Sequence, residues 1–351
     1  MVFDCIVVAS HLRYDGVWQR PHHLVSRFAR RVPVLFVEEP FFAKRDADTI
    51  ERGPEVDVLR PQRKARPATM FDAATLAAVR RWVGERRPLL WLYTPQALPI
   101  AGAFPRAPLV YDRMDDLSAF AFAAPGLAER EERLLESAGL VFTGGRSLFE
   151  RARRFGPKVR LYPSGVDFEH FARAQQIAPH PLFANLLAPV CGYAGVIDER
   201  FDFAAIQALA LRPVEIVLVG PVMKIDTALL PRRSNVHFTG QVEYGELPAF
   251  YAGFDVALVP FARNAATASI SPTKTPEYLA ARKPVVSTPI ADVVADYGEV
   301  VTIAADPETF AQACLFALAP DAGRTERGVA LARAAGWDDI AARMWNDLGR
   351  E

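Results

Sequence analysis

The feature that most constrains the fold of this chain is a regular alternation of short apolar segments with longer helical patterns. In the first half, the apolar segments are "CIVVAS", "PVLFVEE", "VDVLR", "PLLWLY", "PLVYD", "LVFTG" and "VRLYP". Between several of them lie the amphipathic stretches "RPHHLVSRFARR", "FDAATLAAVRRWVGE", "GLAEREERLLESA" and "RSLFERARRFG". Continuous apolar strands joined by helical crossovers are typical of a parallel sheet covered on both faces. The sequence therefore predicts an α/β protein.

The same pattern starts again in the second half. Its strands are expected at "VCGYAGV", "VEIVLVG", "NVHFTG", "DVALVPF", "PVVST" and "VVTIA". A length of 351 residues fits two domains. We expect a Rossmann-like domain at 1–170, a proline-containing linker of weak periodicity at 171–188, a second Rossmann-like domain at 189–335 and a last helix at 336–351.

Charge and cysteine content exclude several classes of protein. The 41 basic and 41 acidic residues cancel, so the sequence gives no signal for nucleic acid. Residues 1–170 carry 26 Lys and Arg against 21 Asp and Glu. This excess fits either a peripheral contact with an anionic membrane surface or ordinary solvated helices. The scattered Cys5, Cys191 and Cys314 indicate buried thiols in a reducing compartment.

Targeting and catalytic motifs are few. The N-terminus enters a strand pattern without a cationic lead, and no apolar run approaches the ~20 residues of a membrane span. We therefore expect a cytoplasmic protein, at most associated with a membrane surface. GxGxxG, Walker A, HExxH, paired CxxC and nucleophile-elbow motifs are missing from the sequence. His22 and His23 are expected to be at the surface or partly buried rather than metal ligands, because neighbours in a helix point to different faces.

The stretch "SPTKTPEY" combines helix-capping residues with a cation and an acid. Ser271, Thr273 and Thr275 favour a helix start, whose free N–H groups attract anions. Lys274 adds a full positive charge, which suits a diphosphate, and Glu277 lies one turn further on, where it suits the paired hydroxyls of a ribose. The alternative is a capped core helix with a solvated lysine and a glutamate that favours the helix dipole.

Four motifs follow one another in the second half at fitting spacings. They are "GYAGVIDERFD", "VLVGPV", "NVHFTGQVEYGELPAFYAGFDVALVPF" and "SPTKTPEYLAARKPVVSTP", within residues 190–303. This half resembles the C-terminal domain of GT-B glycosyltransferases, particularly the group 1, family-4-like branch. The first half resembles the family more loosely, through "DGVWQRPHHLVSRFA", "YDRMDDLSAF" and "VFTGGRSLFERARRFG". The resemblance implies two domains facing a central cleft, and a C-terminal helix that crosses back to pack on the first domain.

The resemblance also implies roles for individual residues on the donor side. Glu277 matches the second glutamate of an E-x7-E pattern that holds the donor ribose, and Lys274 matches a phosphate-contacting residue. Arg200 corresponds to a basic residue that meets the donor diphosphate. Gly195 would allow a close approach of the backbone there. Gly16, after the first strand, resembles the glycine that approaches the phosphates and the transferred sugar from the other domain.

Further donor residues come from the neighbouring loops. The turn "GQVEY", with Gly240 and Val242, resembles the turn that borders the nucleobase. Asn264, before the donor loop, is either a lining residue or part of a loop turn. Ser269 stands where the family has the first glutamate of E-x7-E, and this departure leaves the transferred sugar and the stereochemical outcome open.

Candidate acceptor-side residues follow strands of the first half. In "YDRMDD", Asp115 or Asp116 is the candidate base for a hydroxyl proton, because strand ends line the crevice of doubly wound folds. The alternative for this cluster is a helix N-cap. His11 faces a substrate or is an ordinary loop histidine, and Arg20 touches a substrate or fixes a helix start. The cluster lacks a DxD spacing, and no metal is expected because Arg, Lys and helix amides neutralise a leaving diphosphate.

The function expected from these features is a glycosyltransferase without a cofactor. It would move a sugar from a nucleoside diphosphate sugar to a sugar or lipid-linked sugar acceptor, by family analogy in cell-surface polysaccharide or glycolipid synthesis. Two alternatives stay open: a sugar-nucleotide epimerase on the same fold, and an inactive GT-B scaffold that lost the glutamate at position 269.

Overall fold

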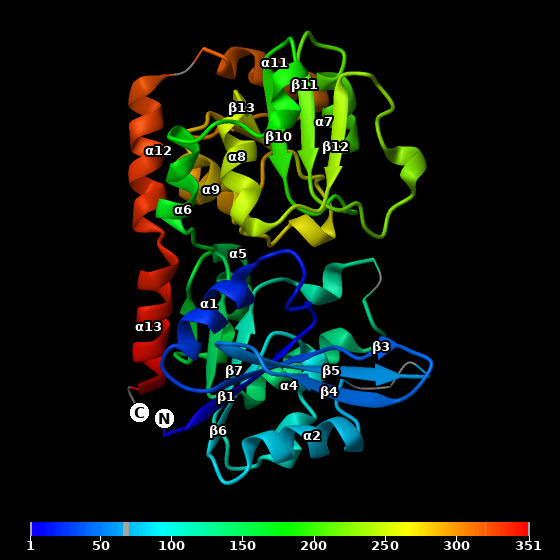
Figure 1. The fold of residues 1–351 in the computed structure, drawn as a ribbon. Helices are drawn as coiled ribbons and strands as arrows, with labels where there is room; N and C mark the ends of the chain where they lie inside the picture. Colours follow the sequence, from blue (N-terminus) through cyan, green and yellow to red (C-terminus); the bar gives the residue numbers. More distant parts are fainter. Residues whose placement is uncertain (1, 66–69, 122, 320, 350–351) are drawn as a thin grey trace. The chain divides into compact units, whose positions relative to one another are not determined.

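A computed structural model describes residues 2–65, 70–121, 123–319 and 321–349 of the chain. The chain divides into two compact units. Figure 1 colours the ribbon along the sequence from blue at the N-terminus to red at the C-terminus. The first unit combines Met1–Pro163 with Asp338–Glu351, and the second is Ser164–Trp337. The chain thus leaves the first unit once and returns to it at its end.

The first unit is built on a nine-stranded sheet in the order β3-β5-β2-β1-β6-β7-β8-β9, with β4 antiparallel to β5. The strands are β1 (Cys5–Ser10), β2 (Val34–Glu38), β3 (Phe41–Phe42), β4 (Ala47–Glu51), β5 (Val56–Arg63), β6 (Pro88–Leu92), β7 (Leu109–Arg113), β8 (Leu140–Thr143) and β9 (Val159–Leu161). The central strand β1 is buried throughout, and Val7 pairs with Leu35 on one side and Leu90 on the other. This burial on both faces explains its unbroken apolar sequence.

Helices connect these strands as the sequence predicts. They are α1 (Arg20–Ala29), α2 (Ala73–Val83), α3 (Ile100–Ala103), α4 (Leu127–Ser137) and α5 (Arg146–Ala152), together with the C-terminal α13 (Trp337–Gly349). In α13, the ring of Trp345 contacts Phe3 and Phe28, each at 5.6 Å between centroids. Ile340 and Met344 are buried on the same helix. The C-terminal helix therefore packs on the first unit, as expected.

The second unit contains a six-stranded parallel sheet in the order β12-β11-β10-β13-β14-β15. The strands are β10 (Val190–Ala194), β11 (Glu215–Val219), β12 (Val236–Gly240), β13 (Val256–Val259), β14 (Val285–Ser287) and β15 (Thr302–Ile303). The helices are α6 (Phe168–Ala172), α7 (Phe203–Leu209), α8 (Leu247–Ala252), α9 (Lys274–Ala280), α10 (Ala291–Tyr297), α11 (Pro307–Ala317) and α12 (Ala322–Ala334). Two doubly wound α/β units are the fold class that the sequence predicted.

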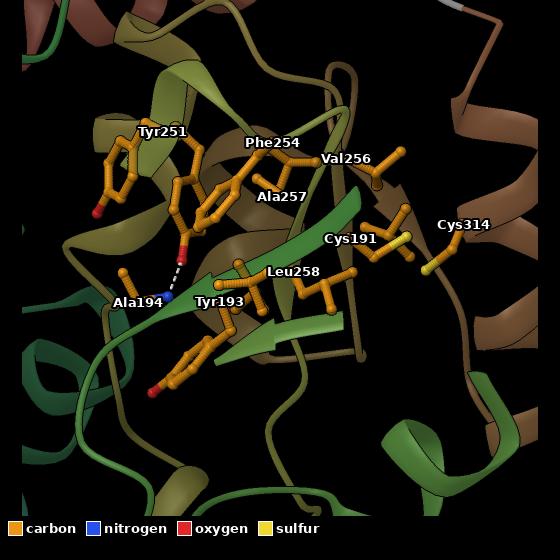
Figure 2. Close-up of a cluster of buried hydrophobic side chains, with 14 of the residues drawn as sticks. Cys191, Tyr193, Ala194, Tyr251, Phe254, Val256, Ala257, Leu258 and Cys314 are labelled. Carbon is orange, nitrogen blue, oxygen red and sulfur yellow. Dashed lines mark hydrogen bonds between the residues drawn. The ribbon is translucent and has the colours of Figure 1, made fainter. Parts of the chain in front are cut away.

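The core of the second unit is packed around β10 (Figure 2). The ring of Phe254 lies where a side chain on Gly192 would be, since an added Cβ would fall 2.1 Å from that ring. The amide of Ala194 donates to the hydroxyl of Tyr278 at 2.8 Å. Cys191 on β10 and Cys314 on α11 are buried free thiols, as the sequence indicated. Glycine and aromatic residues together therefore fix how helices approach this strand.

Residues 171–188 differ from the linker that their weak periodicity indicated. The structure places them in the second unit, as the end of α6 followed by short 3-10 turns, η4 (Arg173–Gln175) and η5 (Pro181–Asn185). Phe171 and Ala174 are buried in that unit's core, and the ring of Phe183 packs edge-on against Phe254. The prolines interrupt helical periodicity, yet the short turns still direct apolar side chains inward.

Candidate active site

Three glycines meet at the carboxyl edge of the second sheet. Gly195 and Gly220 directly follow β10 and β11, and Gly240 ends β12. The amide of Gly220 donates to the carbonyl of Gly240 at 2.9 Å, and a Cβ on Gly220 would lie 2.0 Å from the carbonyl oxygen of Gly195. A side chain on Gly220 is therefore excluded by the backbone of Gly195, so the ends of β10 and β11 can pack closely at this edge. The sequence indicated Gly195 and Gly240 but missed Gly220, although a glycine directly after a strand is a usable signal.

The loop that carries Arg200 is tied to its neighbours on both sides. Ile197 forms a bridge with Val222, and Phe201 forms one with Phe261. Arg200 makes an ion pair with Asp198, with 2.7 Å between Nη2 and Oδ2, and its side chain is 21% exposed. The guanidinium is thus held at this edge, and Asp198, which the sequence did not indicate, lowers the positive charge that a ligand would meet.

The donor-loop helix begins at Lys274, and its first turn holds a buried carboxylate. Glu277 is 2% exposed, and its Oε2 lies 2.8 Å from Nζ of Lys274 and 2.7 Å from the hydroxyl of Tyr251. Lys274 is 12% exposed, so the solvated lysine of the alternative interpretation is wrong. Burial and the nearby carboxylate raise the pKa of Tyr251, which keeps its hydroxyl a donor. Tyr251 was not predicted, because it lies on a separate helix, α8.

Capping of this helix differs from the expectation. Thr273 occupies the N-cap position, but its backbone is already helical (φ −61°, ψ −23°) and its side chain makes no capping hydrogen bond. A capping side chain needs an extended backbone to reach back to the helix amides. Thr275 and Ser269 are buried, and their hydroxyls have no hydrogen-bond partner among the described residues. Ser271 is half-buried in the same loop.

Asn264 organises the loop that precedes the donor helix. Its Oδ1 accepts from the amide of Thr267 at 3.1 Å, and its Nδ2 donates to the carbonyl of Glu199 at 2.9 Å. The hydroxyl of Thr267 is turned to backbone carbonyls of the same loop. These contacts favour the loop-turn interpretation and join this loop to the one that carries Arg200.

The turn "GQVEY" ends in an aromatic stack. The rings of Tyr244 and His170 lie 4.5 Å apart and are nearly parallel, and the hydroxyl of Tyr244 donates to Asp167 at 3.1 Å. Val242 is half-buried against the core. Burial lowers the pKa of His170. Sequence reasoning missed His170, which lies directly before the segment taken for a linker.

In the first unit, Arg20 forms a buried ion pair. Its Nε lies 3.0 Å from Oδ1 of Asp112, and its Nη1 donates to the carbonyl of Tyr162 at 2.7 Å. Both side chains are almost completely buried. Burial raises the pKa of Asp112, and the Arg20 guanidinium opposes this shift. Arg20 therefore joins α1 to β7 and to the chain after β9, which is a positioning role within this unit.

The other acceptor-side candidates lie at the carboxyl edge of the first sheet. Asp115 and Asp116 follow β7, and His11 follows β1. Asp116 is buried and accepts from Arg151 at 2.5 Å and from Ser118 at 2.8 Å, while Asp115 and His11 are half-buried. Asp116 occupies the N-cap position of a 3-10 turn but makes no side-chain capping bond. Gly16 lies in a turn after β1, where its amide donates to the carbonyl of Arg13.

The two adjacent histidines are almost completely buried, so the expectation that they lie at the surface or are partly buried is wrong. The amide of Gln19 donates to Nδ1 of His22 at 3.0 Å, which places the proton on Nε2, and Nε2 donates to the carbonyl of Arg13 at 3.1 Å. The indole of Trp18 donates to Nδ1 of His23 at 3.1 Å. The loop after β1 folds over the start of α1 and covers both rings. Local helix periodicity does not show such a covering loop.

The comparisons with known proteins point to one class. The model of the family described as "Glycosyl transferases group 1" matches residues 188–319. A curated relative from Bacillus subtilis (strain 168), described as a teichuronic acid biosynthesis glycosyltransferase, TuaH, is 29% identical over 136 residues. That match spans 37% of this chain and 34% of TuaH, so it covers about a third of the relative's length.

Solved structures resemble the whole chain. Sucrose-phosphate synthase from Thermosynechococcus elongatus is 18% identical with a TM-score of 0.73, over 99% of this chain and 98% of that one. The trehalose-6-phosphate protein from E. coli bound with UDP-2-fluoro glucose is 12% identical with a TM-score of 0.73, over 99% of each chain. A Burkholderia xenovorans trehalose-phosphate synthase in complex with glucose-6-phosphate is 13% identical with a TM-score of 0.71, over 99% of this chain and all of that one.

The fold of the chain is the GT-B fold of these solved structures. The match over residues 188–319 covers the sheet that carries the three glycines and the donor-loop helix. The resemblance to group 1 glycosyltransferases drawn from the sequence motifs is thereby confirmed.

Proposed function

We propose that this protein is a glycosyltransferase that moves a sugar from a nucleoside diphosphate sugar to an acceptor hydroxyl. The observation that carries the proposal is the buried Glu277, held by Lys274 and Tyr251 beside the glycine edge of the second sheet. A buried carboxylate paired in this way is unusual in a core, where charged groups are stabilised only by good partners. Its position at the carboxyl edge is where doubly wound sheets bind their ligands.

The chemistry follows from the side chains at this edge. Glu277 has acceptor sites beyond those used by Lys274 and Tyr251, and these would take the ribose hydroxyls of the donor. Lys274 and Arg200 would neutralise the negative charge that develops on the leaving diphosphate, together with backbone amides at the glycine edge. The buried hydroxyls of Ser269 and Thr275, which have no partner among the described residues, would hydrogen-bond the donor. No step in this account uses a cofactor.

The acceptor would be activated by a base of the first unit. Asp115 and Asp116 are the candidates, and His11 lies at the same edge of the sheet. Asp116 already holds two partners, Arg151 and Ser118, which would have to share the carboxylate with an acceptor hydroxyl. We propose one of these two carboxylates as the base, and Asp116 also holds the loop through Arg151 and Ser118.

The substrates proposed follow the relatives. TuaH is described by teichuronic acid biosynthesis, and the E. coli neighbour holds a UDP-sugar analogue. We propose a UDP-sugar donor and a saccharide or lipid-linked saccharide acceptor in cell-surface polysaccharide synthesis. None of the described helices has the length and apolarity needed to cross a membrane. Contact with a membrane surface through the basic first unit stays a prediction.

Binding of UDP to the wild type and to Lys274→Ala tests the donor site. Loss of one charge-assisted hydrogen bond is expected to weaken UDP binding by about tenfold or more in calorimetry. Arg327→Ala is the matched control, because it removes an exposed cation from α12 of the same unit. Equal UDP affinity in all three folded proteins would contradict the donor site. Transfer of labelled sugar from a UDP-sugar panel to saccharide acceptors then tests the reaction, and exchange at the sugar carbon without transfer would indicate the epimerase instead.

A further inference from the structure

A cavity of about 370 Å³ lies in the second unit, away from the candidate donor residues. Its walls come from residues 282–285 before β14, from the start of β15, from α11 and from the beginning of α12. Because the sheet is parallel, residues that precede strands lie at its amino edge, whereas the three glycines lie at its carboxyl edge. The cavity is therefore separate from the donor residues, and its volume falls in the range of small-molecule sites.

The charges around this cavity are mostly positive. Arg282, Lys283 and Arg324 line it, and Asp321 is the acidic residue among its described lining residues. The carboxylate of Asp321 is occupied as the N-cap of α12, where it accepts from the amide of Arg324 at 3.0 Å. Such a surplus of cations favours an anionic ligand.

Arg282 stands at a backbone position that favours glycine. Its φ is +59°, and it follows the end of α9. The amide of Arg282 bonds the carbonyl of Leu279, and the amide of Lys283 bonds that of Tyr278, the pattern of a helix C-terminal cap that usually contains glycine. A residue other than glycine is strained at this backbone position. The guanidinium now pairs with Glu326, which is exposed on α12.

Arg324 has unused hydrogen-bonding capacity at the cavity. Its Nη1 donates to the hydroxyl of Thr302 at 3.0 Å, but its Nε is buried and has no hydrogen-bond partner among the described residues. A buried N–H without a partner is unfavourable, and an anion in the cavity would satisfy it. Gln312 adds a polar group to the wall, and Leu279 and Phe316 add apolar surface.

We propose that this cavity is a second binding site, which takes a small phosphate-bearing metabolite of about the size of a hexose phosphate. Arg324 and Arg282 bind the phosphate, because guanidinium groups match its oxygens in pairs. The polar and apolar walls cover the carbon skeleton. This proposal does not depend on the function proposed for the residues at the carboxyl edge of the second sheet.

Calorimetry with glucose 6-phosphate, inorganic phosphate and neutral glucose tests this site. Each protein carries Lys274→Ala, so that the donor residues contribute little to the heat. Arg324→Gln removes the unpartnered Nε, and Gln312→Glu places a carboxylate on the wall at an exposed helix position without altering the core. Arg327→Gln, on an exposed position of α12 outside the cavity lining, is the control for lost charge.

Glucose 6-phosphate is expected to bind the parent and the Arg327→Gln protein equally, and glucose is expected not to bind. The affinity of glucose 6-phosphate should fall about tenfold or more in Arg324→Gln and several-fold in Gln312→Glu. The proposed site is contradicted if glucose 6-phosphate gives no heat at about 10 mM. It is also contradicted if the affinity of glucose 6-phosphate is the same in all four folded proteins. If inorganic phosphate binds as tightly as glucose 6-phosphate, the proposal that the ligand carries an organic skeleton is wrong.

Discussion

At the residue scale, Glu277 shows that a local sequence pattern can indicate an acid at a helix start without indicating that the acid is buried. The stretch "SPTKTPEY" predicts a cation and an acid at a helix start, but it does not show that the acid is buried against Tyr251 of α8. Burial changes the expected effect of a substitution. An acid that only favours the helix dipole contributes about 0.3–1 kcal/mol. A buried acid that pairs with a lysine leaves that lysine uncompensated when it is neutralised.

Glu277→Gln is therefore expected to lower the free energy of unfolding by about 1–3 kcal/mol. It should also weaken UDP binding by about 1–3 kcal/mol, since the carboxylate is proposed to accept two ribose hydroxyls. The wild type should bind UDP more tightly than the 2′,3′-dideoxy analogue, and the variant should not distinguish them. Calorimetry and denaturation measure both effects, with the exposed Glu299→Gln as a control. A wild type that binds the two analogues equally has no ribose clamp.

The buried His22 is expected to make the stability of the protein depend on pH. Burial lowers its pKa from 6.5 to about 4, opposed by its hydrogen bond with the carbonyl of Arg13. The unfolded chain takes up this proton near pH 6.5, while the folded protein does so only near pH 4. The contribution to stability is thus fully present above pH 6.5 and is lost as the pH falls towards 4, by about 3 kcal/mol in total.

We expect the wild type to lose about 2 kcal/mol more than His22→Gln between pH 7 and pH 5, because the variant lacks the titrating ring. Urea denaturation at both pH values measures the two slopes. Other titrating groups contribute equally to both proteins and cancel in the difference. Parallel pH profiles would mean that His22 is protonated at the same pH in the folded and unfolded chains.

At the element scale, the ends of strands β10 and β11 limit which residue can stand at position 220. Gly220 has φ +135° and lies against the backbone of Gly195, so β10 and β11 can end side by side only without a side chain there. Gly220→Ala should lower the free energy of unfolding by about 2–4 kcal/mol and reduce UDP binding. Gly245→Ala is the matched control, since a Cβ there meets nothing within 4 Å and φ is not positive. A stable Gly220→Ala protein with unchanged affinity would show that the backbone moves freely at this edge.

At the scale of the whole molecule, the C-terminal helix α13 returns the chain to the first unit. Residues 338–351 belong to the first unit, although they follow the second in sequence. Deleting residues 338–351 removes the buried Ile340, Met344 and Leu348 from the first unit and leaves the core of the second intact. Hydrogen exchange should therefore quicken in peptides of 1–163 and change little in those of 164–337.

The control for this deletion is Asp339→Asn, at an exposed position of the same helix. It should leave exchange unchanged in both units. Equal acceleration in the two units after the deletion would contradict a specific role of α13 in the first one.

The sequence by itself determined the repeated strand–helix pattern and the class of fold. Each strand that it predicted is present, and most of these strands are buried and apolar, which leaves a local record in the sequence. The strands β3 and β4 were missed because β3 has only two residues and β4, with the sequence ADTIE, has no continuous apolar run. Lys274, Glu277, Arg200 and two of the three edge glycines were named from short motifs, and their role in a donor site stays a prediction.

Only the tertiary structure decided which distant residues complete these motifs. Tyr251 on Glu277, His170 on Tyr244 and Gly220 against Gly195 are such pairs. Most of these partners are brought together by strand order and helix packing rather than by spacing along the chain. The burial of Arg20 with Asp112 and of the adjacent histidines likewise depends on a covering loop and on neighbouring strands. Local sequence fixes periodicity and turn chemistry, whereas burial and pairing of polar side chains arise from contacts between elements.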